Sequence, residues 1–126
     1  MSFDQIKHSV TLEAGADLST KQYCAISVNS SGKAVACDAD DYAAGILQNN
    51  PGSGRAATVT YSGVSKAKLG GTVAAGARVT VNASGLIVAA TTGDSVLGIA
   101  LQGGASGEIG SVLIGAAGVV AAAAVS

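Results

Sequence analysis

Apolar and polar residues alternate over short segments of this chain, and no segment keeps helical spacing for more than one turn. Alternation with a period of two is typical of strands that bury one face, and it is clearest at residues 58–61, TVTY. Clusters of Gly, Asn and Ser separate these segments and mark turns. The pattern predicts strands at residues 8–12, 22–28, 33–37, 57–61, 64–69, 77–81, 86–90 and 111–114, with two more that open at Gly45 and Gly98.

One stretch of the chain returns further along it: VNSSGKAVAC at residues 28–37 is similar to VNASGLIVAA at residues 81–90. A shift of 53 residues aligns residues 28–59 with residues 81–112 without a gap, and 12 of the 32 pairs are identical. Composition alone would give about three identities. The identical pairs fall on turn residues, glycines and β-branched residues, so we interpret them as an internal repeat covering about residues 16–63 and 69–115.

Each repeat is expected to begin with a β-hairpin, because Asn, Ser and Gly between two β-rich runs supply the backbone conformations of a tight turn. A polar connection, a strand that opens with Gly-Ile, a Gly-rich loop and a last strand follow. The predicted fold class is therefore all-β: a small β-barrel or β-sandwich built from two pseudo-symmetric repeats of short antiparallel strands around one core. Residues 1–126 form a single domain in this interpretation, with an N-terminal arm at residues 1–7 and an Ala-rich tail at residues 116–126.

Charge and aromatic content remove two classes of partner. Charged residues make up 12% of the chain and the formal net charge is −1, so we expect no basic surface for nucleic acid or for an anionic membrane. Aromatic residues make up 3%, which argues against stacking platforms for bases or sugars. With 48% hydrophobic residues, a lone monomer would expose much weakly polar surface, so we expect that surface to contact a partner.

The two cysteines, Cys24 and Cys37, lie on the two arms of the first predicted hairpin. A four-residue loop at residues 29–32 would place them opposite each other, whereas a three-residue loop at residues 30–32 would displace them by one position and turn them to opposite faces. Because Ala90 stands where Cys37 would repeat, we favour two thiols packed as small hydrophobic side chains over a disulfide.

The C-terminal run IGSVLIGAAGVVAAAAVS, residues 109–126, carries no charge. It is poor in Leu, Ile and Phe and has no flanking basic or aromatic anchors, so it does not have the composition of a membrane-spanning helix. We expect a last strand followed by the Ala-rich tail, and no membrane as a partner.

No cluster of side chains predicts catalysis or a metal site. His8 is the only histidine and has no nucleophile motif near it, so a catalytic triad is not supported. Asp38, Asp40 and Asp41 share one loop, but a calcium loop would require further oxygen ligands at fixed spacing and a closing Glu. We expect a solvated loop in which the carboxylates form turns.

The stretch PGSGR, residues 51–55, combines glycines with a basic residue, as phosphate-binding loops do. It lacks the Gly-Lys-Ser/Thr ending, and no helix N-terminus follows to supply converging amides. Its counterpart, ASGE at residues 105–108, has Glu108 where Arg55 stands, and a carboxylate would repel a phosphate. We therefore expect no enzyme activity and no cofactor; the two opposite charges either pair between neighbouring subunits or remain exposed ions.

Paired short strands, strand openings of the Gly-Ile type and Ala/Gly-rich turns give the chain a resemblance to a known family. Stretches such as TLEAGADLS, VNASGLIVAATTGDSVLGIAL and ATVTYSG carry it, and it runs over about residues 7–115. The chain resembles the small head decoration, or cement, proteins of tailed bacteriophages. The resemblance implies a compact β-protein without catalytic residues that binds the major capsid protein on the outer surface of an assembled head, often as a trimer, and reinforces it. It also implies assembly in the host cytoplasm and a place in the virion.

Polarity and expected exposure select the contact elements for a capsid or for a neighbouring subunit. They are the N-terminal segment and the Gly-rich loops, represented by Ser2, Phe3, Asp4, Gln5, Ile6, Lys7, Pro51, Arg55 and Glu108. Two other functions remain open for a chain of this kind. One is a ligand- or carbohydrate-binding β-module on a virion surface, which would require aromatic residues at loop tips, and the other is a structural subunit of a phage tail.

Overall fold

The computed structural model describes residues 8–37, 43–91 and 96–114. The strands in these ranges are β1 (His8–Glu13), β2 (Ala25–Val28), β3 (Ala34–Ala36), β4 (Gly45–Leu47), β5 (Ala56–Lys68), β6 (Arg78–Val81), β7 (Ile87–Ala89), β8 (Gly98–Gln102) and β9 (Ile109–Ile114). No helix occurs in the described ranges, and the all-β prediction is confirmed.

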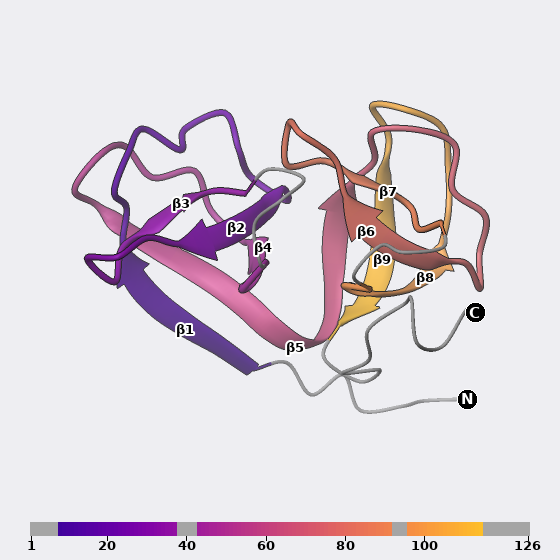
Figure 1. The fold of residues 1–126 in the computed structure, drawn as a ribbon, viewed down its shortest axis with the longest axis horizontal. Helices are drawn as coiled ribbons and strands as arrows, with labels where there is room; N and C mark the ends of the chain where they lie inside the picture. The colour runs from indigo at the N-terminus through magenta and orange to yellow at the C-terminus, as the bar shows by residue number, and fades with distance from the viewer. Residues whose placement is uncertain (1–7, 38–42, 92–95, 115–126) are drawn as a thin grey trace.

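The strands form one sheet in which β5 belongs to two parts (Figure 1). The order along the sheet is β3-β2-β4-β5-β9-β8-β6-β7, and β1 pairs with β5 off this path. The beginning of β5 pairs antiparallel with β1 and β4, whereas its end pairs antiparallel with β9. We call β1 to β4 with the beginning of β5 the first half, and the end of β5 with β6 to β9 the second half. The two halves lie side by side in Figure 1.

The pairing registers of the two halves correspond at a constant offset. Ile26 pairs with Ala36 in the first half, and Val79 pairs with Ala89, each 53 residues further on, in the second. The β2–β4 and β6–β8 ladders, and the β4–β5 and β8–β9 ladders, match at the same offset. The end of β5 takes the place of β1 at an offset of 55, since Thr11 pairs with Thr58 and Lys66 with Ser111.

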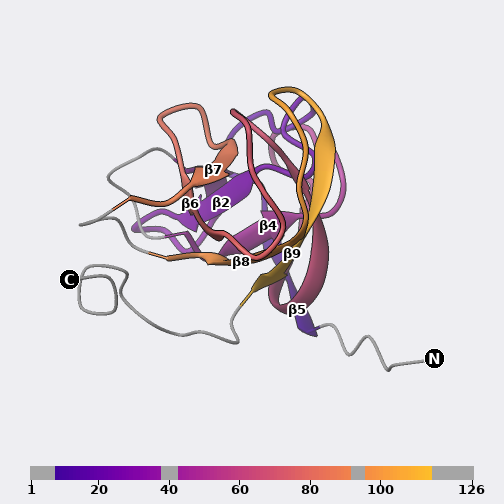
Figure 2. The ribbon, with the colours of Figure 1, turned by 90° about the vertical axis from the view of Figure 1, so that its right-hand side faces the viewer.

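Each half also curls back on itself. An isolated parallel bridge joins Ala14, just after β1, to Ala34 in β3, and a second one joins Leu69, just after β5, to Ile87 in β7. Figure 2, which views the molecule from the side of the second half, shows the strands bending around the interior rather than lying flat. The sheet is therefore strongly curved and has the character of a small β-barrel.

Two strands that the pattern predicts as separate are joined in the structure. The segments expected as separate strands at residues 57–61 and 64–69 form a single strand, β5, which bends sharply at its middle (Figure 1). Gly63 lies at the bend with a φ of 101°, which glycine adopts at little cost. The pattern predicts that Ser62 and Gly63 end the strand. Instead, β5 continues through them, pairing with β1 before this point and with β9 after it.

The predicted strand at residues 22–28 begins later, at Ala25, because the backbone N–H of Cys24 donates to the carbonyl of Lys21 and forms a turn. The last predicted strand is present as β9. The expected arm at residues 1–7 and tail at residues 116–126 lie outside the described residues. In the described ranges there is no helix long and apolar enough to cross a membrane.

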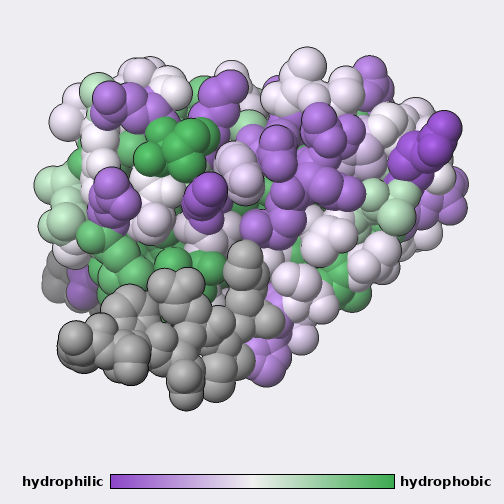
Figure 3. Space-filling view, turned by 180° about the vertical axis from the view of Figure 1, so that it is seen from behind, coloured by the Kyte–Doolittle hydropathy of each residue, from purple (hydrophilic) through white to green (hydrophobic). Residues whose placement is uncertain are grey.

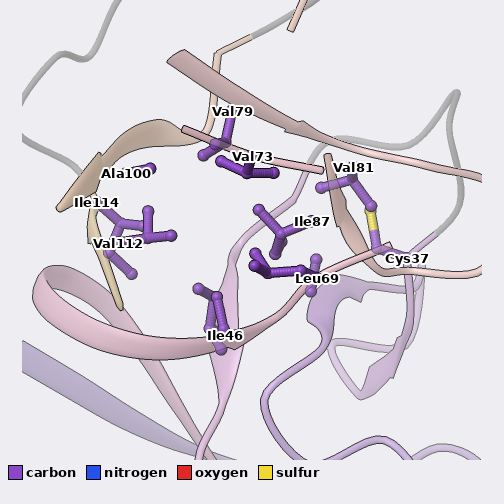
Figure 4. Packing of buried hydrophobic residues seen from close by; sticks show 12 residues of the cluster. Cys37, Ile46, Leu69, Val73, Val79, Val81, Ile87, Ala100, Val112 and Ile114 are labelled. Atoms are coloured by element: carbon purple, nitrogen blue, oxygen red, sulfur yellow. The ribbon is translucent and has the colours of Figure 1, made fainter. Parts of the chain in front are cut away.

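The described residues form two apolar clusters in place of the single core that we expected. The cluster of the first half contains Ala14, Leu18, Ile26, Ala34, Leu47, Ala57 and Val59. The larger cluster of the second half contains Ala67, Leu69, Val73, Val79, Val81, Ile87, Ala100, Val112 and Ile114, together with Ala25, Cys37 and Ile46 from the first half (Figure 4). Each half thus has an aliphatic cluster, and three residues of the first half pack in the cluster of the second.

Candidate functional site

Both hairpin turns are held by the same asparagine contact. The Asn29 side-chain oxygen accepts hydrogen bonds from the backbone N–H groups of Ser31 and Lys33, at 2.9 and 3.0 Å. Asn82 makes the same two contacts 53 residues later, at 2.9 and 3.0 Å, with the N–H groups of Ser84 and Leu86. The two asparagines therefore serve the turns themselves, as side chains that mimic a backbone acceptor do.

The first hairpin has the three-residue loop. Val28 pairs with Ala34, and the N–H of Asn29 donates to the carbonyl of Lys33, so residues 30–32 form the loop. This register displaces Cys24 from Cys37 by one position, and the two buried side chains are thiols that form no disulfide. Burial raises the pKa of the Cys24 thiol, because a thiolate would lose its hydration there. The expectation of two packed thiols is confirmed.

The described residues of the expected contact set lie in two equivalent loops. Arg55 is exposed, and its carbonyl accepts a hydrogen bond of 2.8 Å from the N–H of Ala14. Glu108 is exposed too, and its carboxylate accepts a 2.7 Å hydrogen bond from the N–H of Ala105 within its own loop. Pro51, by contrast, is buried, so the exposure expected for it is not found. Residues 2–7 lie outside the described residues.

These two loops lie along the same edge of the molecule, the upper edge in Figure 1. The N–H of Leu18 donates to the carbonyl of Pro51 at 2.9 Å, and the N–H of Val73 donates to the carbonyl of Gly104 at 2.9 Å. Each loop is thus fixed by backbone hydrogen bonds to the turn that leads into its own half. We call this surface, residues 51–55 and 103–108, the loop edge. It presents Arg55 on one half and Glu108 on the other.

The candidate catalytic and metal-binding groups do not converge. His8 is exposed, and its ring centroid lies 6.2 Å from that of Tyr61, a contact between two surface rings. The loop with Asp38, Asp40 and Asp41 lies outside the described residues. Within the part of the chain that the structure describes, no three His, Cys, Asp or Glu side chains gather as a metal site.

Tyr23 is a feature that the sequence pattern did not indicate. It has a φ of 67°, the left-handed conformation that bulky side chains rarely adopt. Its N–H donates to Leu47 and its carbonyl accepts from Lys68 in the second half, at 2.7 and 2.9 Å. Gly76 stands 53 residues later with a φ of 86°, so extending the repeat alignment upstream of residue 28 would have exposed the position. Tyr23 lies where the two halves meet, and the strain is held there by contacts on both sides.

The surface carries a few large apolar side chains. The exposed ones among the described residues are Val10, Val28, Tyr61, Leu101 and Ile109. On the face opposite to that of Figure 1, apolar side chains reach the surface on both halves, with polar ones between them (Figure 3). Together with the loop edge, these side chains are what the described surface offers for contact with another protein.

The fold and this surface define a class: a small, strongly curved β-protein without a converging chemical site in its described residues. No family model matches the chain, and no curated protein does. Among solved structures, the N base of the head fiber protein gp8.5 of bacteriophage phi29 is similar, with a TM-score of 0.66 and 15% sequence identity. The match covers 86% of this chain and 94% of that chain. At this identity the likeness establishes a shared fold.

Proposed function

We propose that the chain is a structural protein of a bacteriophage virion that attaches to the outer surface of the head and stabilises it, as a decoration or cement protein. The observation that supports the proposal is the shared fold with the base of a phage head fiber, which extends over 86% of this chain. The base of a head fiber has the same structural requirement as a decoration protein. Each has to be a rigid unit with a surface that fits a partner.

The construction of the chain suits that role. Two curled halves share the continuous strand β5, and backbone hydrogen bonds connect them, so the unit resists bending. Small side chains and few charges favour close packing of many copies, where modest contacts add through multivalency. We expect no catalytic activity and no cofactor, because the role requires neither.

The partners in this proposal are the major capsid protein and further copies of this chain, in a trimer. The proposed contact elements are residues 2–7 and the loop edge, where Arg55 and Glu108 are exposed. Exposed opposite charges contribute more to the choice of partner and orientation than to affinity. The protein would assemble onto heads in the host cytoplasm and remain on the outside of the virion.

Co-sedimentation with particles tests the proposal. Particles of the phage that encodes the chain, prepared without it, are mixed with the purified protein and pelleted. We expect saturable binding, with weaker binding after deletion of residues 1–7 and after a double change of Arg55→Ala and Glu108→Ala. A Lys66→Ala variant, changed at an exposed charged residue of β5 outside these elements, serves as the control and is expected to bind as the unaltered protein does. Binding to isolated tails, with none to heads, would assign the protein to the tail and contradict the proposal.

A further inference from the structure

The junction between the two halves is defined by hydrogen bonds of both backbone and side chains. The N–H of Ala25 donates to the carbonyl of Gly85 at 2.9 Å, which links β2 of the first half to the hairpin turn of the second. The side-chain amide of Gln48 donates to the Ser65 hydroxyl at 2.8 Å. The first half therefore contributes β2, β4 and their flanks, and the second half contributes β5 and the β6–β7 hairpin.

The second half buries one of its surfaces in this junction. The equivalent surface of the first half is exposed. Ser65 is 2% exposed, whereas Val10, which holds the corresponding position in β1, is 41% exposed. Val81 is 9% exposed, whereas its counterpart Val28 is 44% exposed. The first half thus exposes a valine at both positions, whereas the corresponding residues of the second half, Ser65 and Val81, are buried in the junction.

The hairpin turns differ in the same way. A Cβ atom added to Gly85 would lie 3.1 Å from the carbonyl oxygen of Cys37, because this turn packs against the first half. Gly32, its counterpart, has a similar φ of 77° and nothing within 4 Å of such an atom. We call this surface of the first half the β1 face; it contains Val10, Glu13, Val28 and Gly32.

The reverse holds for the surface that the first half buries. Ala25 is fully buried in the junction, and its counterpart Arg78 is exposed. Gln48 is partly buried, and its counterpart Leu101 is 48% exposed. We call this surface of the second half the β8 face; it contains Gly76, Arg78, Ile99 and Leu101. β1 lies toward one end of the long axis of the molecule and β8 toward the other (Figure 1).

We propose that a second copy of this chain docks its β8 face on the β1 face, so that the contact between copies repeats the contact between halves. The junction inside the chain shows how the two faces would fit together. The β1 face corresponds to the surface that the second half buries in the junction, and the β8 face to the surface that the first half buries, because the strands of the two halves pair in the same way. The polar pair of Gln48 and Ser65 is replaced at this contact by Leu101 and Val10, an apolar pair that loses its exposure only when a copy docks.

The backbone supplies the directional part of the contact. By analogy with the junction, the N–H of Arg78 donates to the carbonyl of Gly32 in the next copy. The N–H of Glu13 corresponds to that of Lys68 and donates to the carbonyl of Gly76. Because two different faces meet, the assembly is heterologous, and each copy keeps one face of each kind for its neighbours. The inference rests on the proposed homo-oligomer and not on attachment to a phage head.

Light scattering after size-exclusion chromatography tests this arrangement. We expect the unaltered protein to form an oligomer and both Val10→Asp and Leu101→Asp to reduce it to a monomer, with Val28→Asp as a second change on the β1 face. Tyr61→Asp and Ile109→Asp are matched controls, since these side chains are 47% and 45% exposed but lie outside both faces, and they are expected to leave the oligomer intact. Circular dichroism melting of each variant confirms that it is folded.

Mixing the variants distinguishes two different faces from one shared face. The Val10→Asp protein keeps an intact β8 face and the Leu101→Asp protein an intact β1 face, so an equimolar mixture is expected to form a heterodimer. A mixture that stays monomeric overturns the inference, as does dissociation by the control changes alone. A monomeric unaltered protein that still binds phage heads would overturn this inference and leave the proposed function intact. An oligomer that dissociates as expected but binds no head contradicts the proposed function alone.

Discussion

Replacing Gly98 by alanine probes how closely the strands approach each other. A Cβ atom at this position would overlap the carbonyl oxygen of Leu113 in the neighbouring strand β9. Inserting a methyl group into a packed site costs about 1–3 kcal/mol, and disturbing the ladder hydrogen bond beside it costs about 1 kcal/mol more. We therefore expect Gly98→Ala to lower the free energy of unfolding by about 2–4 kcal/mol, a large share of the roughly 5–15 kcal/mol of an ordinary domain.

Urea denaturation followed by far-ultraviolet circular dichroism measures this loss, at one fixed protein concentration because association shifts apparent stability. Gly52→Ala is the matched control, since nothing lies within 4 Å of a Cβ atom there. That change is expected to leave stability unchanged or to raise it by up to about 1 kcal/mol through the unfolded chain. Equal unfolding midpoints for Gly98→Ala and Gly52→Ala would refute the reasoning.

Three further changes test other parts of the structure. Tyr23→Gly is expected to be more stable than Tyr23→Ala by about 1 kcal/mol, the reverse of the usual order in a strand or helix, because only glycine relieves the left-handed backbone; thermal melting of the two variants checks this. Ser65→Ala removes one of the two acceptors of the Gln48 side-chain amide, the one across the junction, and is expected to cost about 1–3 kcal/mol in urea denaturation, whereas Ser53→Ala on an exposed loop is expected to cost nothing measurable. Cys24 is expected to react with iodoacetamide far more slowly in the folded protein than in urea, because burial raises its pKa and limits access; mass spectrometry of partly alkylated protein measures it, and equal rates would contradict its burial.

Alternation and turn residues were sufficient to predict the class of fold. Residues 58–61 alternate in sequence and lie in β5, although Thr60 is buried and Tyr61 exposed there. Asn29 and Gly32 mark a hairpin turn that is present. Repetition of Gly-Ile at residues 45 and 98 predicts both glycines as strand openings. The structure adds the physical reason, because a side chain at either position would overlap a backbone carbonyl of the next strand.

Local pattern could not predict which strands share a core. Ser62 and Gly63 have the composition of a turn, yet β5 continues through them because its beginning and end each have a partner strand. Nothing in the residues of one half shows that its ends return to each other at the Ala14 and Leu69 bridges, since those are long-range contacts. The sequence pattern therefore predicts a single core, whereas the described residues form two clusters.

Polarity predicts the contact residues, but it separates the surface from the interior only on average. Arg55 and Glu108 are exposed as charges usually are, whereas Pro51 is buried beside the turn at Leu18. The sequence pattern around the exposed valines of the β1 face does not differ from that around buried valines. Only comparison with their counterparts Ser65 and Val81 in the folded chain distinguishes them.

Electron microscopy of phage particles that contain or lack this protein tests the central claim most directly. We predict additional density on the outer surface of the head, at repeated positions, in particles that contain the protein. Heads of particles that lack it are expected to lose their DNA more readily on heating. Identical heads in both preparations, with the density difference confined to the tail or absent, would contradict the claim.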